Sequence, residues 1–242
     1  MSELKDIMSF RENISHFSQD RIPERAVIDQ ILKDAHNLIP VKNNQWNYYV
    51  DVYGPEHQKE KKSVALQTIT GYGKRDFAPG GPEHDNIELL EEMYDEWLES
   101  RKPVDENSKH IVRRYKSYGF NDQVRAPYLL VYYQKPAYPT EKQLEQGYRT
   151  RLINNSDGDS HWYISASMHG YGVSLLCAEQ KIHASFCKCY YHSYANYTNI
   201  LAPLKHGFKN VAFLLGIGYR DESMPYYKNI NKPDYNEIVT WK

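Results

Sequence analysis

The sequence has little cysteine, no long hydrophobic run and almost no net charge. Its three cysteines, Cys177, Cys187 and Cys189, form an odd and clustered set, whereas a secreted disulfide framework normally uses an even and spread one. Even a long apolar run such as Val211–Leu215 is far shorter than the roughly 20 residues that cross a membrane. The first residues also lack the apolar stretch of a signal peptide. We therefore expect a cytoplasmic protein without a membrane segment.

The charges are balanced, with 30 Lys and Arg residues against 31 Asp and Glu residues and a net charge of −1. A dedicated nucleic-acid binder usually carries a basic excess, so we expect no nucleic-acid partner. Tyrosine, in contrast, is abundant, with 22 residues against 7 Phe and 4 Trp. A tyrosine ring buries apolar area and keeps a polar tip, which is typical of sheet edges, interfaces and the walls of ligand sites.

Several common catalytic motifs are missing from the chain. Gly216-Ile217-Gly218 lacks the third glycine of a dinucleotide-binding loop, and Tyr219-Arg220-Asp221-Glu222 follows it in place of a helix start. The sequence contains no phosphate loop ending in Gly-Lys-Ser/Thr and no Gly-x-Ser-x-Gly nucleophile elbow. The sequence therefore shows neither a P-loop nor the nucleophile of a serine hydrolase.

Hydrophobic periodicity predicts the helices and strands. Helices are expected at residues 23–38, 56–70, 85–99, 109–116, 162–181 and 193–201, strands at 46–52, 128–133 and 211–218, and loops at 71–84 and 136–160. The first strand alternates between apolar and polar residues, whereas the other two are continuously apolar, as in strands buried on both faces. This order predicts an α+β or α/β sandwich with few central strands.

The helix expected at 162–181 is unusual because it carries a line of small residues. These are Ser165, Ala166, Ser167, Gly170, Gly172, Ser174 and Ala178. A glycine inside a helix costs about 1 kcal/mol relative to alanine, a cost that close packing between neighbouring backbones would offset. We expect such packing at, for instance, a subunit interface.

A possible zinc site lies further along the chain, where His183, Cys187, Cys189 and His192 form a His-x3-Cys-x-Cys-x2-His cluster. Thiolate and imidazole are zinc ligands, but structural zinc sites usually place two or more residues between paired cysteines. In a short strand, Cys187 and Cys189 would point to one face and Lys188 to the other. Buried free thiols are favoured over a metal site, and a zinc-stabilised interaction protein is the remote alternative.

Two polar segments form the candidate binding site. Arg11-Glu12-Asn13-Ile14-Ser15-His16-Phe17 combines a guanidinium with short hydrogen-bonding side chains, a set that suits a phosphate. Pro40-Val41-Lys42-Asn43-Asn44-Gln45-Trp46 is a polar loop between a helix and a strand. Together with Leu215–Tyr219, Lys228 and the tail from Lys232 to Trp241, these segments resemble the motifs of the FMN-dependent nitroreductase family. Residues 71–160 match nothing specific in that family.

The resemblance implies a nitroreductase-like mixed central sheet flanked by helices, an α+β fold. It implies a single domain over residues 1–242, with a helical or loop excursion at about 71–125, and an intertwined homodimer with FMN at the interface. Its cofactor-binding candidates are Arg11, Glu12, Asn13, Ser15, Lys42, Asn44, Lys188, Lys228 and Lys232. Arg11 would neutralise the flavin phosphate, and Lys42 would stabilise negative charge on the reduced ring. Neither a catalytic side chain nor a resident metal is implied.

The activity implied by the resemblance is hydride transfer from NAD(P)H through flavin N5 to a small acceptor, such as a nitroaromatic or a quinone, in a ping-pong cycle. The sequence departs from the family pattern at Ser15, which replaces a basic residue, and at Asn13, which replaces a hydroxyl. Each charge-assisted hydrogen bond contributes about 1.5–3 kcal/mol, so fewer positive charges would weaken FMN binding. A flavin-binding or flavin-less relative without turnover is therefore the alternative. Among the tyrosines, Tyr190, Tyr191 and Tyr194 are the pocket candidates.

Overall fold

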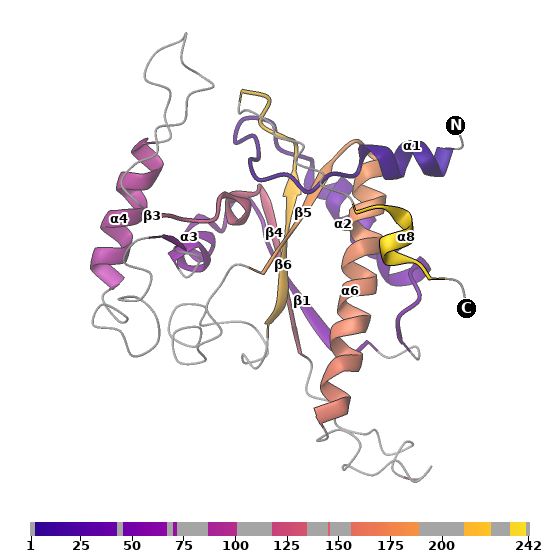
Figure 1. Cartoon of the computed structure of the whole chain (residues 1–242). Coiled ribbons are helices and arrows are strands. Elements are labelled where there is room, and N and C mark those ends of the chain that lie inside the picture. Colours follow the sequence, from indigo (N-terminus) through magenta and orange to yellow (C-terminus); the bar gives the residue numbers. More distant parts are fainter. Residues whose placement is uncertain are drawn as a thin grey trace.

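A four-stranded sheet lies at the centre of the molecule (Figure 1). This computed structural model describes residues 3–42, 46–66, 70–71, 87–100, 118–134, 145, 156–188, 211–223 and 233–240. The strands lie in the order β1 (Tyr48–Tyr53), β4 (Tyr128–Gln134), β6 (Val211–Gly218) and β5 (His183–Cys187). Among the described strands these three pairings are antiparallel, whereas the resemblance implied a mixed sheet.

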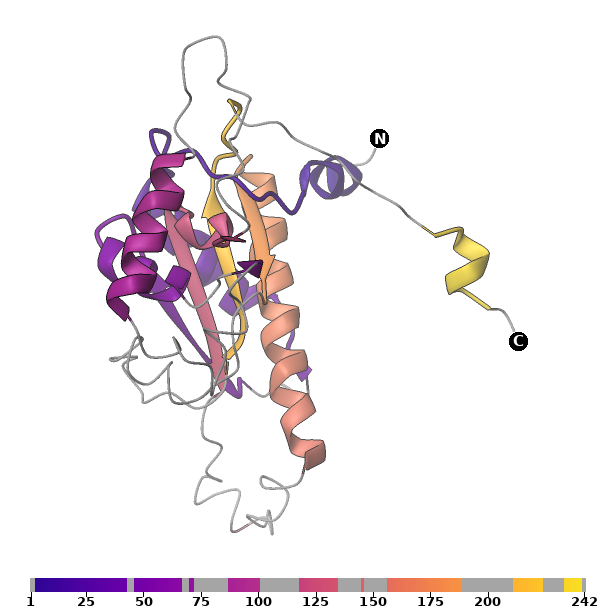
Figure 2. The same cartoon turned by 60° about the vertical axis from the view of Figure 1, so that its left-hand side comes forward.

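Helices cover both faces of this sheet, as the two views show (Figures 1 and 2). The helices α2 (Arg25–Leu38) and α6 (Ser156–Glu179) lie on one face, and α3 (Gln58–Leu66) and α4 (Ile87–Ser100) lie on the other. The remaining elements are α1 (Glu3–Phe10), the 3-10 helix η3 (Asp122–Arg125), the short pair β2 (Thr70–Gly71) and β3 (Tyr118–Gly119), and α8 (Tyr235–Ile238). The expected sheet flanked by helices is therefore confirmed.

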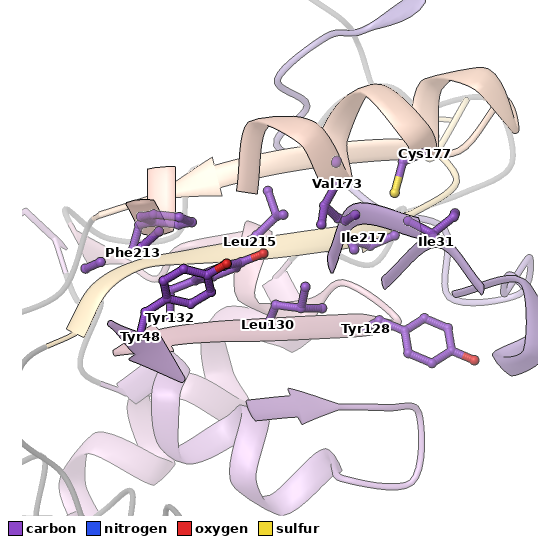
Figure 3. Packing of buried hydrophobic residues seen from close by; sticks show 14 of the residues in the cluster. Ile31, Tyr48, Tyr128, Leu130, Tyr132, Val173, Cys177, Phe213, Leu215 and Ile217 are labelled. Carbon is purple, nitrogen blue, oxygen red and sulfur yellow. The ribbon is translucent and has the colours of Figure 1, made fainter. Parts of the chain in front are cut away.

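Strand β4 divides the core in two because successive side chains of a strand point to opposite faces. Leu129, Val131 and Tyr133 pack with residues of α3 and α4. Tyr128, Leu130 and Tyr132 pack with residues of α2 and α6 (Figure 3). Because both faces are buried, the strand is apolar without interruption, as its sequence predicts. Strand β6 is likewise buried along its whole length.

Most of the small residues of α6 pack within their own chain, against the sheet and α2; the subunit interface expected along this helix stays a prediction. Ser165, Ala166, Ser174 and Ala178 are all buried. A Cβ added at Gly170 would lie 2.8 Å from Cζ of Phe213 in β6, and one added at Gly172 would overlap Ile39, the residue after α2. The glycines therefore allow α6 to pack closely on the sheet and on α2, within one chain.

Several element boundaries differ from those predicted. The helix α6 begins at Ser156, inside the stretch expected to be a loop, and α3 is shorter than the expected 56–70. Periodicity did not locate α1, η3 and β5, which have only eight, four and five residues. The strand at Val211–Gly218 agrees with its prediction. The helices expected at 109–116 and 193–201 lie outside the described residues.

The C-terminal end of α6 is closed by a Schellman motif. The N–H of Ile182 donates to the carbonyl of Cys177 at 2.9 Å, and the N–H of Lys181 donates to the carbonyl of Ala178 at 3.1 Å. Lys181 occupies the position that glycine usually takes, with a φ of 57°. A side chain in this left-handed region costs about 1–2 kcal/mol, so the turn from α6 into β5 contains local backbone strain.

Replacing Lys181 with glycine should raise the free energy of unfolding by about 1 kcal/mol relative to Lys181→Ala, because only glycine adopts this φ without a Cβ clash. Alanine is the matched control, since it also removes the contact between Lys181 Nζ and the Phe10 ring, at 5.2 Å from the centroid. Urea denaturation of both variants measures the difference. Equal stability of the two would contradict the assignment of strain to this turn.

A histidine is buried between α6 and the sheet. Nδ1 of His169 lies 3.0 Å from the hydroxyl of Tyr132, and the ring centroids of His169 and Tyr48 are 5.4 Å apart. The exposed fraction of His169 is 5%. Burial lowers the pKa of His169 from 6.5 to about 4, with a smaller contribution from His36. The imidazole is therefore neutral at physiological pH.

The stability of the fold should fall as the pH decreases from 6.5 towards about 4. In this window the unfolded chain binds a proton at His169 and the folded chain does not, so protons favour unfolding. His169→Gln removes the titration and keeps a hydrogen-bonding partner for Tyr132. Between about pH 7 and about pH 5, the wild type should lose about 2 kcal/mol of unfolding free energy relative to this variant. Parallel pH profiles in chemical denaturation would contradict the prediction.

Candidate functional site

The segment 11–15 is attached to β5 through the side chain of Asn13. Its Oδ1 accepts a hydrogen bond from the N–H of Phe186 at 2.7 Å and lies 2.9 Å from the hydroxyl of Ser185. The same hydroxyl lies 2.5 Å from the carbonyl of Ile14, so its one hydrogen serves one of these acceptors at a time. Ser185 and Ile14 are almost completely buried. Asn13 therefore binds the protein itself with its acceptor oxygen.

The following residues pair with the end of β6. The N–H of Ser18 donates to the carbonyl of Tyr219 at 2.9 Å, and the N–H of Asp221 donates to the carbonyl of His16 at 3.1 Å. Between them, Phe17 and Arg220 form an isolated antiparallel bridge. The chain from 16 to 18 therefore continues the sheet beyond Gly218.

The two glycines of β6 make room for this arrangement. A Cβ added at Gly216 would lie 2.7 Å from the carbonyl oxygen of Gln123 and 3.1 Å from Cε2 of Phe17. A Cβ added at Gly218 would lie 2.6 Å from Cδ of Pro127. Gly216 and Gly218 thus allow backbone and side chains to approach the strand closely, a role independent of dinucleotide binding.

The short helix η3 supplies a second anchor. Nε2 of Gln123 donates to the carbonyl of Ile14 at 3.1 Å and to Oγ of Ser185 at 2.5 Å. On the opposite side, Nζ of the buried Lys61 donates to the carbonyls of Ala126 and Pro127, at 3.2 and 3.1 Å. Burial lowers the pKa of Lys61 to about 8. The residues that follow η3 are therefore also fixed by hydrogen bonds from Lys61 of α3.

Two cations of the site lie over tyrosine rings of α6. The guanidinium carbon of Arg11 is 5.1 Å from the ring centroid of Tyr171, and Nζ of Lys188 is 5.0 Å from that of Tyr163. The two tyrosines are separated by about 12 Å along the helix axis, given a rise of about 1.5 Å per residue. Arg11, which follows α1, and Lys188, which follows β5, therefore both contact the same helix.

The structure describes six of the nine predicted cofactor-binding residues. Arg11 and Lys188 lie over rings of α6, about 12 Å apart along the helix, and Asn13 is bonded to β5. Ser15 and Lys42 are exposed, and Glu12 is half-buried. Burial lowers the pKa of His183, and the Glu12 carboxylate opposes that shift. Outside the described residues lie Asn44, Lys228 and Lys232, as do Tyr190, Tyr191 and Tyr194.

Sequence reasoning missed three residues of this region: Gln123, Ser185 and Tyr171. Gln123 and Ser185 are buried polar residues, and each acts through a partner more than 60 positions away in the chain. Tyr171 lies within the helix predicted at 162–181, but nothing in the sequence places it beside Arg11. Only the three-dimensional arrangement reveals these contacts, because no local pattern distinguishes the residues.

The cysteines that the structure describes are buried free thiols, Cys177 and Cys187, as expected. Burial raises the pKa of Cys177 to about 12, so its thiol is protonated. Nδ2 of Asn121 lies 2.7 Å from Sγ of Cys187. Within the described ranges, no group of three or more His, Cys, Asp or Glu residues could hold a metal ion. Cys189 and His192 lie outside those ranges, so the zinc hypothesis stays untested.

Comparisons with known proteins identify the fold. No family model and no curated protein matches the sequence, but solved structures do. A nitroreductase-like family protein from Bacillus cereus has a TM-score of 0.61 at 12% identity, covering 100% of this chain and 97% of that one. A protein from Exiguobacterium sibiricum, described as a nitroreductase in complex with FMN, has a TM-score of 0.60 at 13% identity, covering 100% and 98%. The chain has the nitroreductase fold.

A third structure with the nitroreductase fold, from Staphylococcus epidermidis and described as an NAD(P)H:FMN oxidoreductase, has a TM-score of 0.59 at 12% identity, covering 100% of this chain and 97% of that chain. In this fold, residues 11–17 lie against Leu215–Tyr219, another segment that resembles a motif of the family. Val41, from the segment Pro40–Trp46, is buried in the same core cluster as Leu215.

Among the described helices, none is long and apolar enough to cross a membrane.

Replacing Asn13 with alanine should lower the free energy of unfolding of the ligand-free protein by about 1–2 kcal/mol, because the Phe186 N–H and the Ser185 hydroxyl lose an acceptor. Ser15→Ala is the matched control, since Ser15 is an exposed small polar residue of the same segment, and it should change the stability by less than about 0.5 kcal/mol. Chemical denaturation measures both variants. An equal effect of the two substitutions would contradict the anchoring role of Asn13.

Proposed function

We propose that this protein is an FMN-dependent oxidoreductase that passes hydride from NAD(P)H to a small acceptor, such as a nitroaromatic or a quinone, in a ping-pong cycle. The observation that carries the proposal is the position of the 11–17 motif, which is anchored to β5 with Arg11 over α6, in a fold shared with a structure that holds FMN. When bound, FMN accepts a hydride at N5 and passes it on.

The residues of this region fit the phosphate end of FMN. Arg11 offers a guanidinium whose fork of donors matches phosphate oxygens. Asn13 uses its oxygen on β5, so its Nδ2 is the atom left for a ligand. Ser15 adds an exposed hydroxyl. Guanidinium, amide and hydroxyl donors together suit a dianionic ligand. Lys188 lies over Tyr163, about 12 Å from Tyr171 along α6, so it is proposed to contact another part of the cofactor.

In this proposal, the chain's own side chains bind, orient and balance charge. Arg11 neutralises the phosphate and fixes the end of the cofactor. Lys42, exposed after α2, stands in the loop proposed to meet the ring, where a positive charge stabilises the reduced flavin. Asn44, Lys228 and Lys232 are proposed to complete the site, and Glu12 to border it. No side chain is assigned as an acid or a base, because hydride transfer to the cofactor requires neither.

The proposal is tested by the spectrum and flavin content of the purified protein. We expect FMN to remain bound through gel filtration and the protein to oxidise NAD(P)H with a quinone acceptor. Arg11→Ala should bind FMN at least tenfold more weakly, because a charge-assisted hydrogen bond contributes about 1.5–3 kcal/mol. Arg21→Ala is the matched control, because Arg21 also lies over a tyrosine ring, that of Tyr219. A colourless protein that added FMN neither binds nor stabilises against heat would overturn the proposal.

A relative without turnover is the second candidate function, favoured by Ser15 at a position that is basic in the family. It expects little or no NAD(P)H oxidation, whether or not flavin binds. Steady turnover with a quinone that Arg11→Ala abolishes would remove this candidate. The zinc-stabilised interaction protein is a third and weaker candidate, which metal analysis of the purified protein tests.

A homodimer, single-domain organisation over residues 1–242 and a cytoplasmic location are parts of the same proposal. The outer face of α6 supports the dimer: Ile164, Met168 and Tyr171 recur at helical spacing and are 40%, 38% and 40% exposed. An apolar stripe of this kind on a helix surface is typical of an interaction site. We propose that α6 packs against a second copy of the chain and that FMN binds at this interface.

Replacing both Ile164 and Met168 with glutamate should convert the dimer into a monomer, because burying two carboxylates without partners costs several kcal/mol. Ile22→Glu is the matched control, since Ile22 is equally exposed, at 43%, but lies in the loop before α2. Light scattering coupled to gel filtration gives the molar masses. A wild type of about 28.5 kDa, the mass of one chain, would contradict the dimer.

A further inference from the structure

The guanidinium group of Arg11 forms a cation–π contact with α6. The guanidinium carbon lies over the ring of Tyr171, 5.1 Å from its centroid. A cation–π contact is not a hydrogen bond to an acceptor, so the five N–H donors of the guanidinium are left for other partners. Among the described residues, no carboxylate forms an ion pair with Arg11.

Arg21 shows the contrasting arrangement in the same protein. Its guanidinium carbon lies 4.8 Å from the ring centroid of Tyr219, but its Nη1 also pairs with Oε1 of Glu222 at 3.3 Å. Part of its donor edge is therefore occupied by an internal anion. Arg11 has the ring contact but no ion pair with a described carboxylate. A site for an external anion requires donors that no internal anion occupies.

The backbone of Arg11 is held on both sides. Its N–H donates to the carbonyl of Ile7 at 3.1 Å, which continues the last turn of α1. The preceding residue, Phe10, packs on the ring of His183, with centroids 4.7 Å apart. Two residues further on, Asn13 accepts the hydrogen bond from Phe186. The backbone of Arg11 is therefore fixed, and the contact with Tyr171 restricts the conformation of its side chain.

We propose that Tyr171 is a positioning residue of an anion site, and that its ring holds Arg11 ready to bind a phosphate monoester, the terminal group of FMN. The inference rests on the proposed function and adds a residue outside the 11–17 motif. A side chain ordered before binding loses less conformational entropy when the ligand binds. The face of the Tyr171 ring, and not its hydroxyl, is the group that acts.

The expected effect follows from the strength of a partly exposed cation–π contact. Losing it in Tyr171→Leu should weaken FMN binding about two- to fivefold. Riboflavin lacks the phosphate, so its affinity should be unchanged in the same variant. Tyr171→Phe keeps the ring face and should retain the wild-type affinity for FMN. Tyr219→Leu, the matched control, removes the ring under Arg21 and should leave FMN affinity unchanged.

Quenching of flavin fluorescence, measured with the ligand-free full chain, gives the FMN and riboflavin affinities, and thermal melting checks that each variant is folded. As a second measurement, inorganic phosphate competes with FMN, and its inhibition constant should rise by the same two- to fivefold factor in Tyr171→Leu. If the wild type binds FMN and the leucine variant binds it equally well, or loses riboflavin affinity to the same extent, the positioning role of Tyr171 is overturned. If the wild type binds no FMN, the proposed function fails, and this inference fails with it.

Discussion

The attachment of residues 11–18 to the sheet is the interaction on which the rest of the site depends. One side of the attachment uses side chains, from Asn13 to the backbone of β5 and from Gln123 to the carbonyl of Ile14. The other side uses backbone pairing of 16–18 with the residues after β6. Because both sides must form together, the position of Arg11 is determined by segments more than 100 residues apart in the sequence.

The tyrosines of β4 connect the layers of the fold. The hydroxyl of Tyr128 donates to the carbonyl of Pro23 before α2, that of Tyr133 donates to Asp51 of β1, and that of Tyr132 reaches His169 of α6. Each ring buries apolar area in the core while its polar tip satisfies a group in a neighbouring element. Burial raises the pKa of both Tyr132 and Tyr133, so these hydroxyls are protonated donors or acceptors. Much of the tyrosine excess is therefore explained by packing.

The elements that the sequence predicts well are those with a long local pattern. The strand at 128–133 and the strand at 211–218 are buried on both faces, and an uninterrupted apolar run follows directly from that burial. Strand β5 is short, with five residues, and so gives no such pattern. The small residues of α6 are visible in the sequence, but the surface that they face is not. Their packing on Phe213 and Ile39 follows from the crossing of helix and sheet, a tertiary property.

For the site, the sequence predicts the segment 11–17 and its phosphate-binding chemistry, but not which of its side chains bind the protein and which are left for a ligand. Asn13 and Arg11 look alike as polar candidates, yet Asn13 uses its acceptor oxygen on the protein and Arg11 lies over a tyrosine ring. This division has a physical reason. An acceptor oxygen has no use beside a phosphate, so directing it inward costs the site nothing, whereas a donor edge used internally would be lost to an anion. The ring of Tyr171 resolves the conflict for Arg11, because a cation–π contact restrains the guanidinium without a hydrogen bond from its N–H groups to a protein acceptor.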